Sequence, residues 1–223
     1  MDFAEWEVYY RKILEDFGYS RAEDERSARI LDAKLGGVRI DPETLRAVFA
    51  AKEAVIAGNA PRLREELAAV AHPLVAADEA TSVLRQAGIR PDVIVTDLDG
   101  AVEDQVAANA EGTVVVIHAH GDNIAAVEAW APKFRGPVIG TTQSRPFGRI
   151  YNFGGFTDGD RAAFLADALG AASLLLLGFD FETPSPKDAD VETKKRKLDW
   201  AYILIQALDV SMYEEPDSEG DDV

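Results

Sequence analysis

The chain has 223 residues, of which 47% are hydrophobic and 28% charged, a composition typical of a globular protein long enough to form one sizeable core. Its 40 acidic and 23 basic residues give a formal net charge of −17, which argues against binding to nucleic acid or to an anionic membrane through a general field. The absence of cysteine excludes disulfides, thiolate catalysis and cysteine-type zinc sites, and the acidic start is unlike a signal peptide, so we expect a cytoplasmic protein.

Residues 1–51 have the pattern of an N-terminal helical extension. Apolar residues recur at helical spacing in residues 2–17, and a glycine follows as a stop signal. A second helix is predicted over residues 20–35, with a serine as its N-cap, and an Asp-Pro pair opens a short helix over residues 41–51. The apolar face of the first helix needs a cover, either from the rest of the chain or from a second copy in a homodimer.

Residues 52–212 alternate between short apolar runs and amphipathic stretches, which favours a doubly wound α/β catalytic domain with a mainly parallel, Rossmann-like sheet. The apolar runs lie at residues 53–58, 73–78, 91–98, 113–122, 136–142 and 173–181. Helical stretches follow them at residues 61–70, 79–88, 102–112, 123–134, 157–171 and 194–208. The acidic tail, residues 213–223, is expected to be disordered.

Carboxylates stand at the ends of three successive runs in this domain. In an open parallel sheet, ligands bind beyond the C-terminal ends of the strands. Mg²⁺ prefers hard oxygen ligands, and clustered carboxylates raise one another's pKa until a divalent ion neutralises them. We therefore expect these aspartates to form a Mg²⁺ site, although each of them alone is equally typical of a turn or a helix cap. The candidate ligands are Asp78, Asp97, Asp99 and Asp122.

Other polar residues at the same predicted edge are candidates for binding a substrate or a nucleotide. Gly58 and Asn59 precede a predicted helix, whose first backbone N–H groups can bind a phosphate. The remaining candidates are Asn123, Thr142, Gln143, Asp158, Asp160 and Lys194. Asp158 is equally typical of an N-cap. Lys194 belongs to a basic cluster that suits either a solvated helix start or charge neutralisation over a polyphosphate. The other members of this cluster are Lys187, Lys195, Arg196 and Lys197.

Two further features have alternative interpretations. His118 and His120 flank an alanine at the end of one run and could be taken for zinc ligands. Because the pattern supplies no third soft ligand, we favour hydrogen-bonding roles for both histidines. The aromatic and glycine residues at 151–156 suit either one wall of a slot for a flat heterocycle or the core, and the core is the more frequent outcome.

The stretch VIVTDLDG, residues 93–100, resembles the opening signature of haloacid-dehalogenase-type phosphatases. In that class Asp97 would be the nucleophile, Thr141 would supply the hydroxyl of the second motif, and Lys194 would be the lysine of its active site. That signature normally opens the domain, whereas two strand–helix units precede it here, over residues 53–88. The last acidic motif of the class matches LLLLGFDF only loosely.

A second resemblance covers nearly the whole chain and is to the archaeal 6-hydroxymethyl-7,8-dihydropterin diphosphokinases (MptE-like). The motifs that carry it are, in order, W-x-x-x-Y, F-G-Y-S-R, GN after the first run, AADEAT, IRPDVIVTDLDG, HAHGDN, GTTQ, NFGGFTDGDRA, LLLLGFDF and KKRKLDWA. The resemblance implies transfer of a diphosphate from ATP to the hydroxymethyl group of a reduced pterin, with Mg²⁺ as cofactor and release of AMP. It also implies a place in the biosynthesis of a tetrahydropterin cofactor of the methanopterin or folate type.

A more distant resemblance is to thiamine diphosphokinases, which share the ATP-to-AMP chemistry and a thiamine-diphosphokinase-like catalytic domain. Their pattern of Mg²⁺-binding aspartates falls on the same four carboxylates, and Asp97, Asp99 and Asp122 are the candidate catalytic residues, with Asp122 as a candidate proton acceptor. This chain departs from the pattern at Glu79, where a glycine is usual, and at residues 59–62, which replace the usual phosphate loop. A non-catalytic module that binds ATP with Mg²⁺ is a further alternative.

Overall fold

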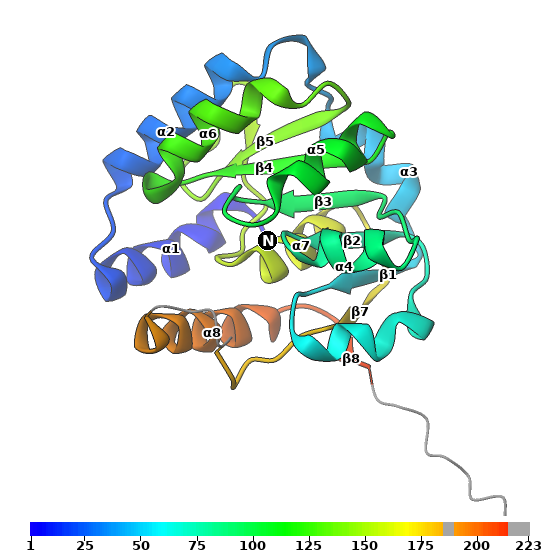
Figure 1. Ribbon diagram of the computed structural model, residues 1–223. Helices are drawn as coiled ribbons and strands as arrows, with labels where there is room; N and C mark the ends of the chain where they lie inside the picture. Colours follow the sequence, from blue (N-terminus) through cyan, green and yellow to red (C-terminus); the bar gives the residue numbers. More distant parts are fainter. Residues whose placement is uncertain (185–189, 214–223) are drawn as a thin grey trace, which may run out of the picture.

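The computed structural model describes residues 1–184 and 190–213, which form three layers with a parallel sheet in the middle (Figure 1). The sheet has eight strands in the order β6-β5-β4-β3-β2-β1-β7-β8, and each neighbouring pair is parallel. The strands are β1 (Glu53–Ala57), β2 (Leu74–Ala77), β3 (Val93–Thr96), β4 (Val114–Ala119), β5 (Val138–Thr142), β6 (Ile150–Tyr151), β7 (Ser173–Leu177) and β8 (Val210–Met212). The predicted α/β class with a mainly parallel sheet is confirmed.

Helices cover both faces of the sheet. The α-helices are α1 (Phe3–Phe17), α2 (Arg21–Lys34), α3 (Arg46–Phe49), α4 (Ala80–Gln86), α5 (Val102–Ala110), α6 (Ile124–Trp130), α7 (Asp158–Ala168) and α8 (Val191–Ile205). The 3₁₀ helices are η1 (Gly36–Val38), η2 (Pro42–Leu45), η3 (Pro61–Arg64), η4 (Glu66–Ala69), η5 (Gly121–Asn123) and η6 (Ala131–Lys133). None of the described helices combines the length and the apolar character that a bilayer crossing requires.

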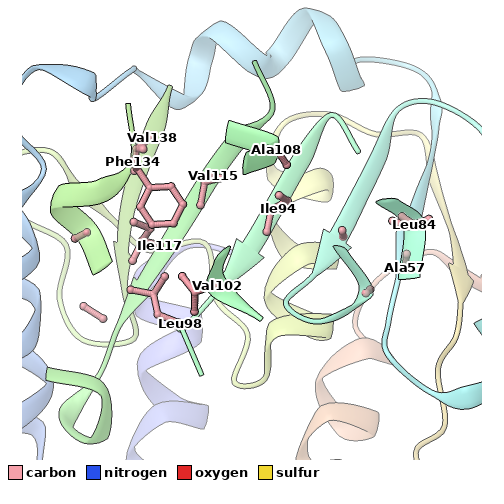
Figure 2. Close-up of a cluster of buried hydrophobic side chains, with 14 of the residues drawn as sticks. Ala57, Leu84, Ile94, Leu98, Val102, Ala108, Val115, Ile117, Phe134 and Val138 are labelled. Carbon is pink, nitrogen blue, oxygen red and sulfur yellow. The ribbon is translucent and has the colours of Figure 1, made fainter. Parts of the chain in front are cut away.

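Successive strand residues point to opposite faces, so each strand contributes to two apolar clusters. In β4, Val115 and Ile117 belong to the cluster under α2, α4, α5 and α6, whereas Val114 and Val116 belong to the cluster under α3, α7 and α8. Figure 2 shows Phe134 among the side chains that pack beside Ile117 in the first cluster. Full burial of a side chain of this size contributes about 1.5–3 kcal/mol, so these two clusters hold the layers together.

The N-terminal helices pack onto the sheet domain. α2 lies against β4, β5 and α6, and its Leu31 is fully buried. α1 buries Trp6, Tyr10 and Ile13 in a third apolar cluster with residues of α7 and α8. In Figure 1 the arrowheads of β1 and β3 point toward the side on which α1 and α8 lie. The chain itself therefore covers the apolar face of α1, while a homodimer stays a prediction.

Some elements differ from those that the pattern indicated. Residues 61–70, predicted as one helix, form the two 3₁₀ helices η3 and η4 instead, and the buried Glu66 carboxylate accepts a hydrogen bond from the Gly178 N–H at 2.6 Å. The edge strand β8 was not predicted, because three residues in a polar stretch give too weak a pattern. Lys187 and residues 214–223 of the predicted tail lie outside the described residues.

Asp24 on α2 joins the N-terminal helices to the ends of the strands. This side chain is almost completely buried and accepts three hydrogen bonds. One oxygen accepts from the Gly121 backbone N–H at 2.7 Å, and the other accepts from the Tyr10 hydroxyl at 2.6 Å and from the Gln143 amide at 2.9 Å. The Trp6 indole N–H donates to the Gln143 carbonyl at 2.7 Å. Two N-terminal helices thus hold the chain segments that follow β4 and β5.

We expect Asp24→Asn to lower the free energy of unfolding by about 2–3 kcal/mol in urea denaturation, because hydrogen bonds to charged groups contribute about 1.5–3 kcal/mol each. An asparagine amide has the same shape, but its nitrogen cannot accept a hydrogen bond. Glu15→Gln, at an exposed position of α1, removes the same charge and serves as the control, with an expected change within about 0.5 kcal/mol. An equally small loss of unfolding free energy in both variants would show that the hydrogen bonds of Asp24 do not stabilise the fold.

Candidate active site

Carboxylates from three separate chain segments converge at the C-terminal edge of the sheet. Asp78 follows β2, Asp97 and Asp99 follow β3, and Asp158 is the first residue of α7. Each offers an oxygen that lies within 4.8 Å of the oxygens offered by the other three. These four residues are named the carboxylate group. It brings together three of the four predicted metal ligands, and it includes Asp158, which was predicted to bind substrate.

Asp122 is the predicted ligand that the structure places elsewhere. It lies in η5, directly after β4, and its side chain is exposed. Within the described part of the chain, it does not belong to the carboxylate group. The fourth carboxylate is supplied instead by Asp158, the first residue of α7.

Two residues with left-handed backbone set the directions of these carboxylates. Asp78 has a φ of 41° and Leu98 a φ of 70°, a region that residues other than glycine rarely occupy. The side chain of Leu98 is buried in the apolar cluster under α5, as Figure 2 shows, so its aspartate neighbours are left at the sheet edge. The Thr96 hydroxyl accepts from the Leu98 N–H at 2.9 Å and donates to Asp78 at 2.8 Å.

Gly100 makes room for Asp78. The Gln105 amide donates to one oxygen of Asp78 at 2.8 Å. A Cβ atom at position 100 would lie 2.1 Å from the other oxygen of Asp78 and 2.7 Å from Cγ of Glu79. The glycine that follows the two aspartates in VIVTDLDG is therefore required by the packing of the carboxylate group itself.

A histidine and an arginine contact the carboxylate group. His120 Nε2 lies 3.2 Å from Asp97 Oδ2. Arg161 on α7 is buried, and its Nη1 lies 3.1 Å from Asp158 Oδ1 and 4.0 Å from Asp97 Oδ2. The other oxygen of Asp97 is buried without a hydrogen-bond partner among the described residues. Sequence reasoning missed Arg161, although its position three residues after Asp158 at a helix start was a usable signal.

The pKa values within the carboxylate group diverge. Burial would raise the pKa of Asp97, but the hydrogen bond and charge of His120, together with the charge of Arg161, outweigh it and hold this pKa well below its usual range. Burial and the charges of Asp97 and Asp78 raise the pKa of Asp99 to about 7. Burial, followed by the charge of Asp97, also raises the pKa of Asp158. The group therefore resists full ionisation without a cation.

The donor set is one that could hold a divalent cation. All four side chains offer carboxylate oxygens, which suit a hard ion such as Mg²⁺ better than a soft metal. The unpartnered buried oxygen of Asp97 is a polar atom that such an ion would satisfy. His118 is buried beside Thr141, with its Nδ1 3.1 Å from the threonine hydroxyl, and neither predicted histidine belongs to a metal-ligand group of the described residues.

Several predicted binding residues have all their polar atoms occupied within the protein. The Asn123 amide donates to the carbonyls of Asp97 and His118 at 2.8 and 2.7 Å, and its oxygen accepts from the His120 N–H at 3.0 Å and from the Ser27 hydroxyl at 3.1 Å. Asn123 thus ties the end of β4 to the end of β3.

Two further predicted residues act in the same structural way. The Thr142 hydroxyl is buried and accepts from the Ser144 N–H at 3.2 Å. Asp160 is fully buried and accepts from the backbone N–H groups of Phe156 and Thr157 at 2.7 and 2.6 Å, as part of the N-terminal cap of α7. In the aromatic stretch 151–156, Phe156 is buried in the core, as the core interpretation predicts, whereas Tyr151 and Phe153 are only partly buried against it.

The remaining candidates flank the carboxylate group on the side of β1 and α8. A Cβ atom at Gly58 would lie 2.6 Å from the Gly178 carbonyl, so this glycine permits the close approach of β1 and β7. The Asn59 amide donates to Glu79 at 2.8 Å, which links the two positions where the chain departs from the thiamine diphosphokinase pattern. Lys194 lies on α8, and its positive charge acts on Asp99.

A pocket of about 210 Å³ lies on the opposite side, next to His120. Residues 18–24 at the junction of α1 and α2 form one wall, and residues 120–122 form another together with Gln143. Gln143 therefore lines the pocket, while its amide donates to Asp24 and its oxygen accepts from Arg161 at 3.3 Å.

Comparison with known proteins gives a consistent result. The family model described as 6-hydroxymethylpterin diphosphokinase MptE-like matches residues 38–185. Three curated archaeal proteins named 6-hydroxymethyl-7,8-dihydropterin pyrophosphokinase are similar over nearly their whole length. The protein of Methanothermobacter thermautotrophicus is 43% identical (94% of this chain, 96% of that protein), that of Pyrococcus furiosus 40% (93% and 94%), and that of Methanocaldococcus jannaschii 36% (93% and 96%).

The fold is similar to that of solved structures. Among them is the MAf glycosyltransferase of Magnetospirillum magneticum AMB-1, with a TM-score of 0.50 and 19% sequence identity. The similarity covers 76% of this chain but only 29% of that chain. At this identity the likeness supports the parallel α/β arrangement and nothing about activity.

Replacing Gly100 by alanine tests the packing of the carboxylate group. We expect Gly100→Ala to abolish stabilisation by Mg²⁺ in thermal melts, because the new methyl group would displace the Asp78 carboxylate from the group. The matched control is Gly37→Ala, since nothing lies within 4 Å of a Cβ atom at that position. If Mg²⁺ raised the melting temperatures of Gly100→Ala and of the wild type equally, the expectation that Asp78 is a Mg²⁺ ligand would be wrong.

Repulsion among the carboxylates gives a pH-dependent expectation for the metal-free protein. Because the pKa of Asp99 is raised to about 7 in the folded state, above its value in the unfolded chain, the folded protein loses stability as pH rises from about 4 to about 7. Asparagine cannot ionise, so we expect the melting temperature of Asp99→Asn to exceed that of the wild type by more at pH 8 than at pH 5, in EDTA.

Glu103→Gln, at an exposed position of α5, is the control for this pH series, and its difference from the wild type should stay constant. If the difference in melting temperature between Asp99→Asn and the wild type did not change with pH, the neighbouring charges would not raise the pKa of Asp99.

Proposed function

This chain belongs to the MptE-like 6-hydroxymethylpterin diphosphokinase family, and from that premise we propose that it transfers diphosphate from ATP to 6-hydroxymethyl-7,8-dihydropterin and releases AMP. The relatives' names supply the activity. The observation that carries the proposal in this chain is the carboxylate group, with oxygens within 4.8 Å of one another at the C-terminal strand ends. This edge of an open parallel sheet is where such folds bind their ligands.

We propose Mg²⁺ as the cofactor, held by the carboxylate group. The oxygen-only donor set and the unpartnered buried oxygen of Asp97 support this assignment. Relative to the sequence-based ligand set, Asp158 replaces Asp122. When bound, the ion neutralises charge on the triphosphate, which a chain of net charge −17 would otherwise repel.

The residues of the chain contribute chiefly position and charge. The hydroxymethyl oxygen forms a bond to the β-phosphorus of ATP, the bond from that phosphorus to the oxygen bridging the α-phosphorus breaks, and AMP leaves with that oxygen. The hydroxyl proton passes to water. Phosphoryl transfers of this kind depend on alignment and charge neutralisation more than on covalent catalysis. Arg161 holds Asp158 by a hydrogen bond, and Lys194 places positive charge on the α8 side of Asp99.

Incubation with ATP, Mg²⁺ and 6-hydroxymethyl-7,8-dihydropterin tests the proposal, with AMP measured by chromatography. We expect AMP to form only when all three are present. Asp97→Asn should lower the rate at least about 100-fold, since removing one preorganised charged group typically costs that much. Glu103→Gln, exposed on α5, should leave the rate unchanged.

The alternative activities give different products in the same assay. A haloacid-dehalogenase-type phosphatase would hydrolyse a simple phosphate ester without ATP and would form an acyl phosphate at Asp97. A non-catalytic module would bind ATP with Mg²⁺ and release no AMP. Either result would contradict the proposed transfer.

A further inference from the structure

We propose that the pocket between residues 18–24 and residues 120–122 binds the ring of the reduced pterin, with Asp122 as an acceptor for its N–H groups and Tyr19 as part of its wall. The inference rests on the proposed function and assigns one side of the site to one of its two substrates. It also gives Asp122 and Tyr19 roles that differ from metal binding and from the core.

The size of the pocket suits a two-ring compound better than a whole nucleoside triphosphate. Its volume is about 210 Å³. Pockets for drug-sized ligands usually measure about 300–1,000 Å³, and a water molecule takes about 30 Å³ of liquid volume. A dihydropterin with one hydroxymethyl group is much smaller than ATP and suits this space.

The charges around the pocket favour a neutral ligand that donates hydrogen bonds. Among the described residues that line it, none is lysine or arginine, and three are acidic. Asp24 is already saturated by three donors, but Asp122 is exposed and its carboxylate accepts no hydrogen bond from the described residues. The amide and amino groups of a pterin form a row of N–H donors, and a carboxylate can accept hydrogen bonds from them. The phosphates of a nucleotide would be repelled by the acidic side chains here.

Tyr19 is held in place at the pocket. Its ring stacks on Phe17 with centroids 5.3 Å apart and an interplanar angle of 14°. Burial, followed by the charge of Asp122, raises the pKa of the Tyr19 hydroxyl, which is consistent with the two side chains facing the same space. A fixed aromatic side chain beside a free carboxylate is a combination suited to a flat heterocycle.

The pocket adjoins the carboxylate group through defined contacts. His120 lines the pocket and also lies 3.2 Å from Asp97 Oδ2. Gln143 lines it as well, and its oxygen accepts from Arg161, which in turn donates to Asp158. A ring in this pocket can therefore present its hydroxymethyl group toward the carboxylate group. Lys194 acts on Asp99 from the α8 side, which leaves that side for the phosphates.

Titration calorimetry with each substrate class separates the two sides of the site. The probes are 6-hydroxymethyl-7,8-dihydropterin, with Mg²⁺ and α,β-methylene ATP present, and α,β-methylene ATP with Mg²⁺ alone. We expect Asp122→Asn and Tyr19→Leu each to raise the Kd for the dihydropterin at least about tenfold and the Kd for the nucleotide less than about twofold. Glu128→Gln, exposed on α6, is the control and should change neither.

Any other pattern of dissociation constants contradicts the inference. If both variants bound the dihydropterin as tightly as the wild type, the ring would bind elsewhere. If the nucleotide affinity fell as much as or more than the dihydropterin affinity, the pocket would serve the nucleotide or Asp122 would hold the ion. A wild type that bound nucleotide but no dihydropterin would instead contradict the proposed function itself. Melting temperatures within about 2 °C of the wild type confirm that the variants fold.

Discussion

Four carboxylates held within 4.8 Å of one another are the constraint on which the rest of this structure depends. Burial and mutual repulsion raise the pKa of Asp99 and Asp158, while His120 and Arg161 keep Asp97 ionised. Such a group is stable only if the surrounding fold is rigid enough to hold like charges together. The proposed divalent cation would remove the repulsion that the fold has to withstand.

The rest of the chain supplies that rigidity. Left-handed backbone at Asp78 and Leu98, together with the close packing of Asp78 against Gly100, aims the carboxylates at one point. The N-terminal helices contribute through Asp24, which fixes both the Gly121 backbone and the Gln143 side chain. One segment of α2 thus forms part of the sheet's apolar core, anchors the loop after β4 and lines the pocket. The N-terminal helices therefore belong to the site in a physical sense.

The strands and the convergence of carboxylates at their ends could be predicted because period-2 burial and strand-end aspartates are local patterns. The choice between Asp122 and Asp158 could not be predicted, since it depends on where η5 and the start of α7 lie in the folded chain. Arg161 looked like an ordinary helical residue, and only tertiary packing makes it the buried partner of two carboxylates. For the same reason Asn123 and Thr142, polar residues near a predicted site, turned out to be hydrogen-bonded within the scaffold.

The most direct test of this account is the position of the ion in a crystal grown with Mn²⁺ and α,β-methylene ATP, located by anomalous scattering. The account predicts a peak within about 2.0–2.3 Å of carboxylate oxygens of Asp97 and Asp99, with Asp78 or Asp158 in or next to its coordination sphere. A peak coordinated by Asp122, or bound only to the nucleotide without Asp97, would contradict it.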